Sequence, residues 1–195
     1  MDIMNLLYTF KARKWLLVTQ GVLKHSFGKM GKHTRILSPT RIANCKYIKL
    51  GNNVYIDTGV YMTADDSGNS QPNIEIMDGV KLGNFNHIAC VESIVIEKNV
   101  LTADRVYISD NMHIYMDIDS PIKSQGIMSK GSVIIGENSW IGDNVAIVSC
   151  RIGKNCVIGA NSFVNSDIPD YSVAVGCPAR VVKRYNFEER IWEKI

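Results

Sequence analysis

Histidine is scarce in this chain, and the position of one histidine points to acid–base chemistry. The four histidines are His25, His33, His87 and His113. His113 lies in residues 109–132, a stretch too long for a turn, and loops of such length in compact domains are usually functional or disordered. An imidazole, whose ordinary pKa is about 6.5, can take a proton from a hydroxyl near neutral pH. Position alone supports two interpretations equally, a general base and a loop histidine without a role.

Residues 135–169 carry the regular pattern that must position any such group. Aliphatic residues recur there every six positions, with one step of five, at Ile135, Ile141, Ile147, Ile152, Ile158 and Val164. Strands and helices have side-chain periods of about 2 and 3.6 residues, so neither fits. A period of six is typical of a parallel β-helix, in which each hexapeptide gives one short strand and one turn of the coil.

The same spacing recurs upstream, so the predicted all-β coil covers roughly residues 35–169 within a domain of residues 35–184. Aliphatic residues at the first position of each repeat should stack as a ladder inside the coil, with Gly, Asn and Asp at its corners. Two segments, 64–73 and 109–132, interrupt the repeats. We expect the first to be a short excursion and the second to be a protruding loop.

Helices are predicted at both ends of the coil. Residues 1–34 form a basic amphipathic segment, with a helix over about residues 3–24 whose apolar side gathers Leu6, Leu7, Phe10, Leu17 and Leu23. This helix either packs on the core or on a partner subunit, or it rests on an anionic membrane surface as a peripheral contact. Residues 185–195 predict a short C-terminal helix, with an apolar side formed by Phe187, Ile191 and Trp192.

Composition favours a globular, cytoplasmic protein. The 195 residues suit one well-buried domain, and five cysteines without a C-x-x-C pair favour a reducing compartment over a disulfide framework. The run WLLVTQGVL is interrupted by polar residues and lacks a small-residue cleavage site, which argues against export. The first 50 residues carry a net charge of +9 and the remainder −6, which favours an anionic partner for the N-terminal part. We expect no nucleic-acid partner.

Three separated segments resemble the hexapeptide-repeat acyltransferases, in the branch that contains galactoside, maltose and nodulation-factor O-acetyltransferases and polysaccharide-modifying relatives. They are NFNHIACVE (84–92), DNMH (110–113) and the run 134–184, which ends NSDIPDYSVAVGCPARVVKR. The resemblance covers about two-thirds of the chain. It implies a left-handed parallel β-helix, a homotrimer with active sites between subunits, and direct transfer of acetyl from acetyl-CoA to a hydroxyl of a sugar or glycan acceptor.

The resemblance also implies roles for three residues on the acceptor side. His113 matches the catalytic histidine that deprotonates the acceptor hydroxyl. Asn84 matches an asparagine beside the acceptor and the transferring acetyl group, where an amide can donate to the developing oxyanion, although asparagine is also a common turn residue. Glu92 matches an acidic acceptor-binding residue, and an ordinary exposed repeat residue is the alternative. His87 could line the cleft, but we expect it to be a packing or surface histidine.

On the cofactor side, the resemblance places the pantetheine arm of acetyl-CoA in a groove between subunits, along the last coils. The matching positions are Gly142, Ala160, Asn165 and Ser166 for the arm, Arg180 and Lys183 for the phosphates, and Trp140 for the active-site end of the groove. Relatives commonly have Thr-Lys where this chain has Asn165-Ser166, so one basic contact is missing. The five-residue step from Ile147 to Ile152 should tighten a corner beside this groove.

Three alternative functions stay open. The γ-class carbonic anhydrases share the fold and bind zinc through three histidines, but the clustered histidine pair typical of that class is missing from this sequence, so we expect no metal. Sugar N-acetyltransferases of the same fold transfer to an amine. A β-helix scaffold that has lost catalysis is the non-enzymatic alternative.

The basic N-terminus favours a lipid-linked or membrane-proximal glycan acceptor over a free disaccharide.

Overall fold

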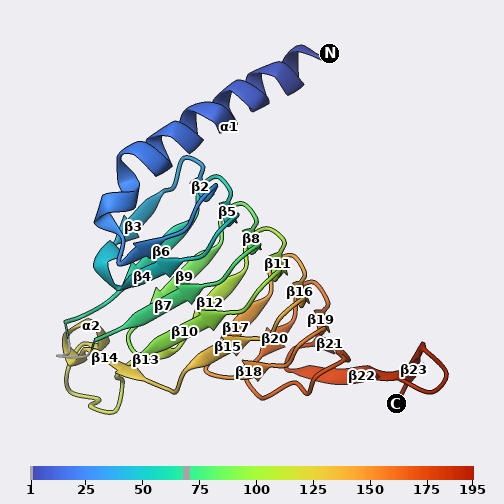
Figure 1. The fold of residues 1–195 in the computed structure, drawn as a ribbon. Helices are drawn as coiled ribbons and strands as arrows, with labels where there is room; N and C mark the ends of the chain where they lie inside the picture. Colours follow the sequence, from blue (N-terminus) through green and yellow to red (C-terminus); the bar gives the residue numbers. More distant parts are fainter. Residues whose placement is uncertain (1, 68–70) are drawn as a thin grey trace.

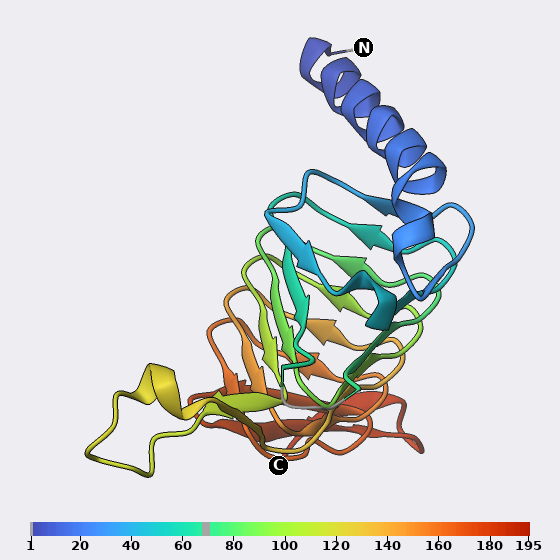
Figure 2. The same ribbon diagram turned by 90° about the vertical axis from the view of Figure 1, so that its left-hand side faces the viewer.

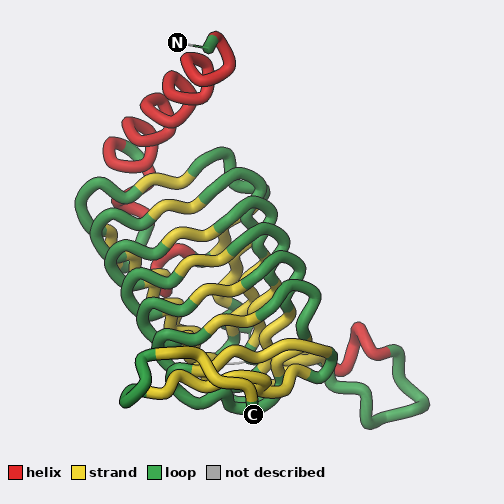
Figure 3. Tube along the Cα trace, turned by 90° about the vertical axis from the view of Figure 1, so that its right-hand side faces the viewer, coloured by secondary structure: helices red, strands yellow, loops and turns green. Residues whose placement is uncertain are grey.

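The computed structural model describes residues 2–67 and 71–195, and it shows a coil of short parallel strands with a long helix at the N-terminal end (Figure 1). Successive turns of the coil stack on one another along its axis (Figure 3). Each turn contributes one strand to each of three sheets, so the predicted alternation of short strands and corners is confirmed.

The three sheets are here called A, B and C. Sheet A contains β1 (Lys29–Met30), β4 (Ile48–Leu50), β7 (Asn73–Ile76), β10 (Ser93–Ile96), β15 (Val133–Ile135) and β18 (Arg151–Ile152). Sheet B contains β2 (Arg35–Ile36), β5 (Tyr55–Ile56), β8 (Lys81–Leu82), β11 (Leu101–Thr102), β16 (Trp140–Ile141), β19 (Val157–Ile158), β21 (Ser172–Gly176), β22 (Ala179–Asn186) and β23 (Ile191–Lys194). Sheet C contains β3 (Arg41–Ala43), β6 (Tyr61–Ala64), β9 (His87–Cys90), β12 (Tyr107–Ser109), β17 (Ala146–Val148) and β20 (Phe163–Val164).

The remaining elements lie outside these three faces. They are α1 (Ile3–Gly21), the 3-10 helices η1 (Leu23–Ser26) and η2 (Cys45–Tyr47), α2 (Ile122–Gln125), and the antiparallel pair β13 (Asn111–His113) and β14 (Ile127–Ser129).

Inward-pointing aliphatic side chains stack in register and form the core. In sheet C, Ile108 lies between Ile88 and Ile147, and all three are fully buried. Successive side chains of a strand point to opposite faces, so the residues that alternate with these point outward. Burial of apolar surface contributes about 25 cal/mol per Å² removed from water, and the ladder belongs to the one cluster of buried side chains that forms the core. The predicted interior ladder is therefore confirmed.

The corners of the coil depend on residues that tolerate unusual backbone angles. Asn53, Asn99 and Asn144 lie in the left-handed region, with φ between 55° and 57°, which asparagine adopts more readily than most residues. At Gly136 a Cβ atom would lie 2.4 Å from the carbonyl carbon of Gly153 in the next coil. Only glycine permits that approach, so this pair fixes how closely two coils stack.

The five-residue step from Ile147 to Ile152 falls at the corner between β17 and β18. Ser149 turns this corner in the left-handed region, with a φ of 48°. Its N–H donates to the carbonyl of Ser109 in the preceding coil at 3.0 Å. The missing residue is thus absorbed by a tight two-residue turn, as the spacing predicted.

The predicted N-terminal helix is confirmed as α1, and its second half contacts the coil. Ala12 and Thr19 are buried, the Ile36 N–H donates to Thr19 Oγ1 at 3.1 Å, and Gln20 Nε2 donates to the Thr34 carbonyl at 2.7 Å. The earlier turns project beyond the first coil (Figure 1). α1 therefore covers the open N-terminal end of the core with one part of its length only.

Residues 109–132 leave the coil as a protruding loop, which confirms the prediction for this segment. The chain goes out along β13, turns through α2, and comes back along β14, well to one side of the coil (Figure 2). At its base, the Lys130 N–H donates to the Asp110 carbonyl at 2.8 Å. The other interruption, residues 64–73, falls partly outside the described residues.

The predicted C-terminal helix over residues 185–195 is wrong, because this segment is a β-hairpin. β22 pairs antiparallel with both β21 and β23. Tyr185 and Trp192 face each other across the hairpin, with ring centroids 5.4 Å apart, and Phe187 packs against Tyr185 at 5.1 Å. Cross-strand aromatic pairs stabilise a sheet, and in so short a segment they outweigh the weak helical periodicity.

Candidate active site

His113 ends β13, where the protruding loop leaves the coil, and its side chain is exposed. Within residues 2–67 and 71–195, no side chain hydrogen-bonds to the imidazole. The ring lines a hollow of about 480 Å³, here called the His113 hollow, whose other walls include Tyr61, His87, Tyr107, Met112 and Ile127. A base at this position can meet a hydroxyl that enters the hollow from solvent.

Asp110 holds the start of the loop, and sequence reasoning did not single it out. Its carboxylate is fully buried and accepts the backbone N–H groups of Val91 at 2.9 Å, Glu92 at 2.8 Å and Ser93 at 2.8 Å. Asn111 Nδ2 also donates to it, at 3.0 Å. These bonds tie the residues before His113 to the corner after β9. In the sequence, the only sign of this anchoring role is that an acidic residue comes directly after a buried strand.

Cys90 lies against the same carboxylate. Its thiol donates to Asp110 Oδ2 at 3.3 Å, and burial, followed by the negative charge of Asp110, raises the pKa of Cys90 far above its usual range. The thiol therefore stays protonated at neutral pH. Cys90 supports the loop base as a hydrogen-bond donor.

Glu92 lies next to the His113 hollow, on the far side of Ile127. It lines a second hollow of about 340 Å³, to which Ile127 and Ser129 also contribute. Its carboxylate accepts hydrogen bonds from the hydroxyls of Ser129 and Ser132, the latter at 3.2 Å. The structure therefore places Glu92 near His113 and shows it joined to the returning strand of the loop.

Asn84 lies at the opposite edge of sheet C from His113. It precedes β9, whereas His113 follows β12, the strand that pairs in parallel with β9. Its side-chain Nδ2 donates to both carboxylate oxygens of Asp104, at 3.1 and 3.2 Å, and its backbone N–H donates to the same group at 2.7 Å. Within the described residues of one chain, the structure does not bring Asn84 to His113.

A third hollow continues along sheet C toward the later coils. It has a volume of about 490 Å³, and its lining includes Met112, Ser149, Phe163 and Asn165. Met112 also lines the His113 hollow, so the two are neighbours. The Ser149 hydroxyl is buried here and has no hydrogen-bond partner among the described residues. Sequence reasoning missed Ser149, although the five-residue step marks its corner.

The predicted cofactor residues divide between the two edges of sheet C. Gly142 and Ala160 stack on each other at the corner between sheets B and C, where Asn84 also lies, and a Cβ at position 142 would be 2.7 Å from the Ala160 nitrogen. Asn165 and Ser166 follow β20 at the other edge, on the side of His113. Ala160 is exposed, as are Asn165 and Ser166.

The other predicted cofactor residues lie farther from these edges. Trp140 points outward from sheet B and is half exposed. Arg180 and Lys183 lie on β22, where Arg180 is exposed and Lys183 is partly buried.

His87 packs between two tyrosines on the outer surface of sheet C. Its ring centroid lies 4.5 Å from that of Tyr61 and 5.3 Å from that of Tyr107. Partial burial lowers the pKa of His87, so its imidazole is neutral over a wider pH range. His87 therefore packs against two tyrosines at the surface and also lines the His113 hollow.

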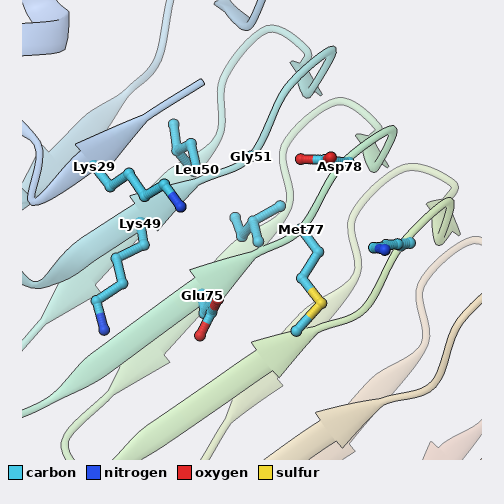
Figure 4. A pocket seen from close by; sticks show the side chains of 9 residues that line it. Lys29, Lys49, Leu50, Gly51, Glu75, Met77 and Asp78 are labelled. Carbon is cyan, nitrogen blue, oxygen red and sulfur yellow. The ribbon is translucent and has the colours of Figure 1, made fainter. Parts of the chain in front are cut away.

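Sheet A carries a separate hollow of different character. It has a volume of about 200 Å³ and is lined by charged side chains, among them Lys29, Lys49, Glu75 and Asp78 (Figure 4). It lies on a different face of the coil from sheet C and includes no histidine. Across the described residues, no group of three or more His, Cys, Asp and Glu side chains is arranged to hold a metal ion.

The comparisons with known proteins agree with this fold. A family model described as bacterial transferase hexapeptide (six repeats) matches residues 132–166. A relative in Escherichia coli (strain K12) with the provisional name lipopolysaccharide biosynthesis O-acetyl transferase WbbJ is 34% identical over 163 residues, which span 80% of this chain and 81% of the relative. The galactoside O-acetyltransferase of the same organism is 28% identical and is matched over 88% of this chain and 70% of its own length.

A solved structure shows the same architecture. AntD, an N-acyltransferase from Bacillus cereus solved in complex with dTDP and 3-hydroxybutyryl-CoA, superposes with a TM-score of 0.73 at 21% identity, over 88% of this chain and 90% of AntD. The coil is thus a left-handed parallel β-helix, as the resemblance implied. The chain belongs to the hexapeptide-repeat acyltransferase family, and it is an acyltransferase.

Proposed function

We propose that this protein is an acetyl-CoA-dependent O-acetyltransferase that acts on a sugar or a polysaccharide or lipid-linked glycan precursor. The observation that carries the proposal is the exposed His113 imidazole, which opens on a hollow at the mouth of a loop anchored by Asp110. Similarity to WbbJ and to galactoside O-acetyltransferase supports a hydroxyl of a sugar as the acceptor.

The proposed reaction is a direct transfer. His113 takes the proton of the acceptor hydroxyl as its oxygen attacks the thioester carbonyl of acetyl-CoA. The tetrahedral intermediate collapses by breaking the C–S bond, and the imidazolium returns the proton to the leaving thiolate. The products are an acetyl ester and CoA. The Asn84 amide donates to the oxyanion of the intermediate, and Glu92 binds acceptor hydroxyls.

The geometry supports a homotrimer with sites between subunits. Sheet C presents an outward row at one register position that begins with Arg41 and continues with mostly aromatic and apolar side chains, Tyr61, His87, Tyr107, Ala146 and Phe163. The matching outward row of sheet A carries more charge, with Lys29, Lys49, Glu75 and Arg151 beside the apolar Val95 and Ile134. Aromatic surface depleted of charge is typical of subunit interfaces.

Packing of sheet C against other copies would also complete the site. The edge with Asn84, Gly142 and Ala160 in one subunit would meet the edge with His113 and Asn165 in the next, because a threefold ring joins opposite edges of the same face. The neighbouring subunit would close the His113 hollow. Acetyl-CoA would then lie between the two edges, with its pantetheine arm along Gly142, Ala160, Asn165 and Ser166. Trp140 would wall its active-site end, and Arg180 and Lys183 would be placed for the phosphates.

We further propose a cytoplasmic location, with access to a membrane-proximal acceptor. All five cysteines are free thiols, as is usual in a reducing compartment. The basic N-terminal segment favours an acceptor near an anionic surface over a free disaccharide.

The direct test is acetyl transfer by the purified protein. Acetyl-CoA and a panel of sugars without amines should give CoA release, detected with a thiol reagent, and an acetyl ester, detected by mass spectrometry. A parallel panel of amino sugars separates O-transfer from N-transfer, since an N-acetyltransferase is inert toward the first panel. Absence of ester formation with every amine-free acceptor would refute the proposed function.

A further inference from the structure

An apolar stripe runs along α1 on the side that faces away from the coil. Ile3, Leu6, Leu7, Phe10 and Leu17 recur at helical spacing, and each is at least half exposed, with Phe10 at 71% and Leu17 at 74%. Among the side chains of α1 whose burial is described, the two that are buried, Ala12 and Thr19, lie on the opposite side of the helix. The stripe is therefore not the surface that holds α1 to the core.

Cations border the stripe. Lys11 and Arg13 fall on either side of it by helical spacing, Lys14 lies within its arc, and all three are exposed. No acidic residue occurs within Ile3–Gly21, and the single acid of the first 50 residues is Asp2, which caps the helix by accepting the Met4 N–H. The apolar stripe and the positive charge thus share one exposed surface.

The geometry of the whole molecule leaves this surface open to a large, flat partner. The early turns of α1 extend beyond the coil in two perpendicular views (Figures 1 and 2). Among the described helices, none combines the length and apolarity that crossing a membrane would require. A helix with one apolar side bordered by Lys and Arg lies in the plane of a lipid interface, with the apolar side among the acyl chains.

We infer that α1 binds the protein to an anionic lipid surface, with Phe10 and Leu17 inserted and with Lys11, Arg13 and Lys14 at the headgroups. The positive charge beside the stripe favours an anionic lipid surface over a second copy of the chain as the partner that covers it. A second helix of the same kind would bring more positive charge to the stripe, whereas an anionic bilayer neutralises it. This inference goes beyond the proposed acetyl transfer, and it can be tested without any measurement of activity.

The experiment is co-sedimentation of the full-length protein with vesicles of phosphatidylcholine alone or with about 30% phosphatidylglycerol, a composition that gives a negative surface potential. We expect binding to the anionic vesicles and little binding to the neutral ones. The K11Q/R13Q/K14Q variant should bind the anionic vesicles on the order of 100-fold more weakly, since each cation contributes about 1 kcal/mol at such a surface. A matched variant, K98Q/K154Q/K194Q, removes three exposed lysines elsewhere and should bind like the unaltered protein.

The apolar stripe is tested separately with F10S/L17S, and I195S removes an equally exposed apolar residue at the other end of the chain as its control. We expect F10S/L17S to lose binding and to keep its oligomeric state in analytical ultracentrifugation. Three results would overturn the inference: an unaltered protein that stays in the supernatant, K11Q/R13Q/K14Q binding as well as its control, or F10S/L17S dissociating the oligomer. The last would show that a second copy covers the stripe. A protein that binds vesicles but transfers no acetyl would refute the proposed function and leave this inference standing.

Discussion

Among single residues, His113 has an exposed imidazole that contributes little packing. Its removal should therefore lower catalytic activity without lowering the stability of the fold. We expect His113→Ala to lower kcat/KM for acetyl transfer by about 100- to 10,000-fold, the usual contribution of a general base. The melting temperature should change little. Steady-state kinetics and thermal unfolding measure the two effects. His25→Ala, at an exposed histidine of η1, is the matched control and should behave like the unaltered enzyme. Full activity of His113→Ala would refute the proposed mechanism.

We expect Asp110 to affect catalysis only by holding the loop that carries His113 in place. Asp110→Asn replaces a buried acceptor of three backbone N–H groups with an amide that can accept on one oxygen only. Loss of such bonds should cost about 1–3 kcal/mol of unfolding free energy, measured in urea. kcat should fall while the KM for acetyl-CoA stays the same, because the loop base and not the late coils would shift. Asp78→Asn, at an exposed corner of sheet A, is the control. Unaltered stability in Asp110→Asn would contradict this account.

The thiols should differ sharply in reactivity. Burial raises the pKa of Cys150 to about 11 and raises that of Cys90 further, so both are protonated and shielded under mildly alkaline conditions. Cys177 is exposed. Iodoacetamide at a pH of about 8, near the ordinary pKa of a free thiol, should therefore label Cys177 in the native protein and spare Cys90 and Cys150 until urea is added. Peptide mass spectrometry measures the order in which the cysteines are alkylated. Labelling of Cys90 before urea is added would show that the base of the loop opens in the native protein.

At the scale of elements, the spacing between coils is set by close backbone contacts. Gly136→Ala would place a Cβ against the Gly153 backbone, and the coils must separate to admit it. We expect a loss of about 1–3 kcal/mol, as for other overpacked sites. Gly21→Ala is the matched control, because nothing lies within 4 Å of its Cβ, and it should not destabilise the protein. Equal melting temperatures for the two variants would contradict the proposed role of Gly136.

The elements also show what the sequence could predict. The six-residue spacing predicted the coil and its buried ladder, because inward aliphatic side chains at Ile88, Ile108 and Ile147 are a direct result of the period. It failed at residues 185–195, where a few apolar residues fit helical and strand spacing alike and aromatic pairing decides. The role of Asp110 could not be predicted, since it depends on backbone N–H groups contributed by the preceding coil.

At the scale of the whole molecule, the separation of Asn84 and His113 predicts complementation between subunits. In a threefold ring, each mixed trimer of Asn84→Ala and His113→Ala chains contains one site with both residues intact. Random assembly of equal amounts should therefore restore about a quarter of the sites, although each variant alone is nearly inactive. Co-expression followed by activity per trimer is the measurement. Mixing the purified, non-exchanging trimers is the control and should restore nothing. No recovery in co-assembled trimers would place each site within one chain.

The insertion that carries His113 leaves the coil around it undisturbed. Ile94 pairs with Val133 and Ile108 pairs with Ile147 across residues 109–132 as if the loop were absent. The anchoring bonds of Asp110 and Lys130 lie at the root of the loop, and none depends on the residues at its tip. Changes to the residues at the tip break none of these bonds and should therefore leave the coil intact. The stability of the coil and the sequence of the tip are thus independent of each other.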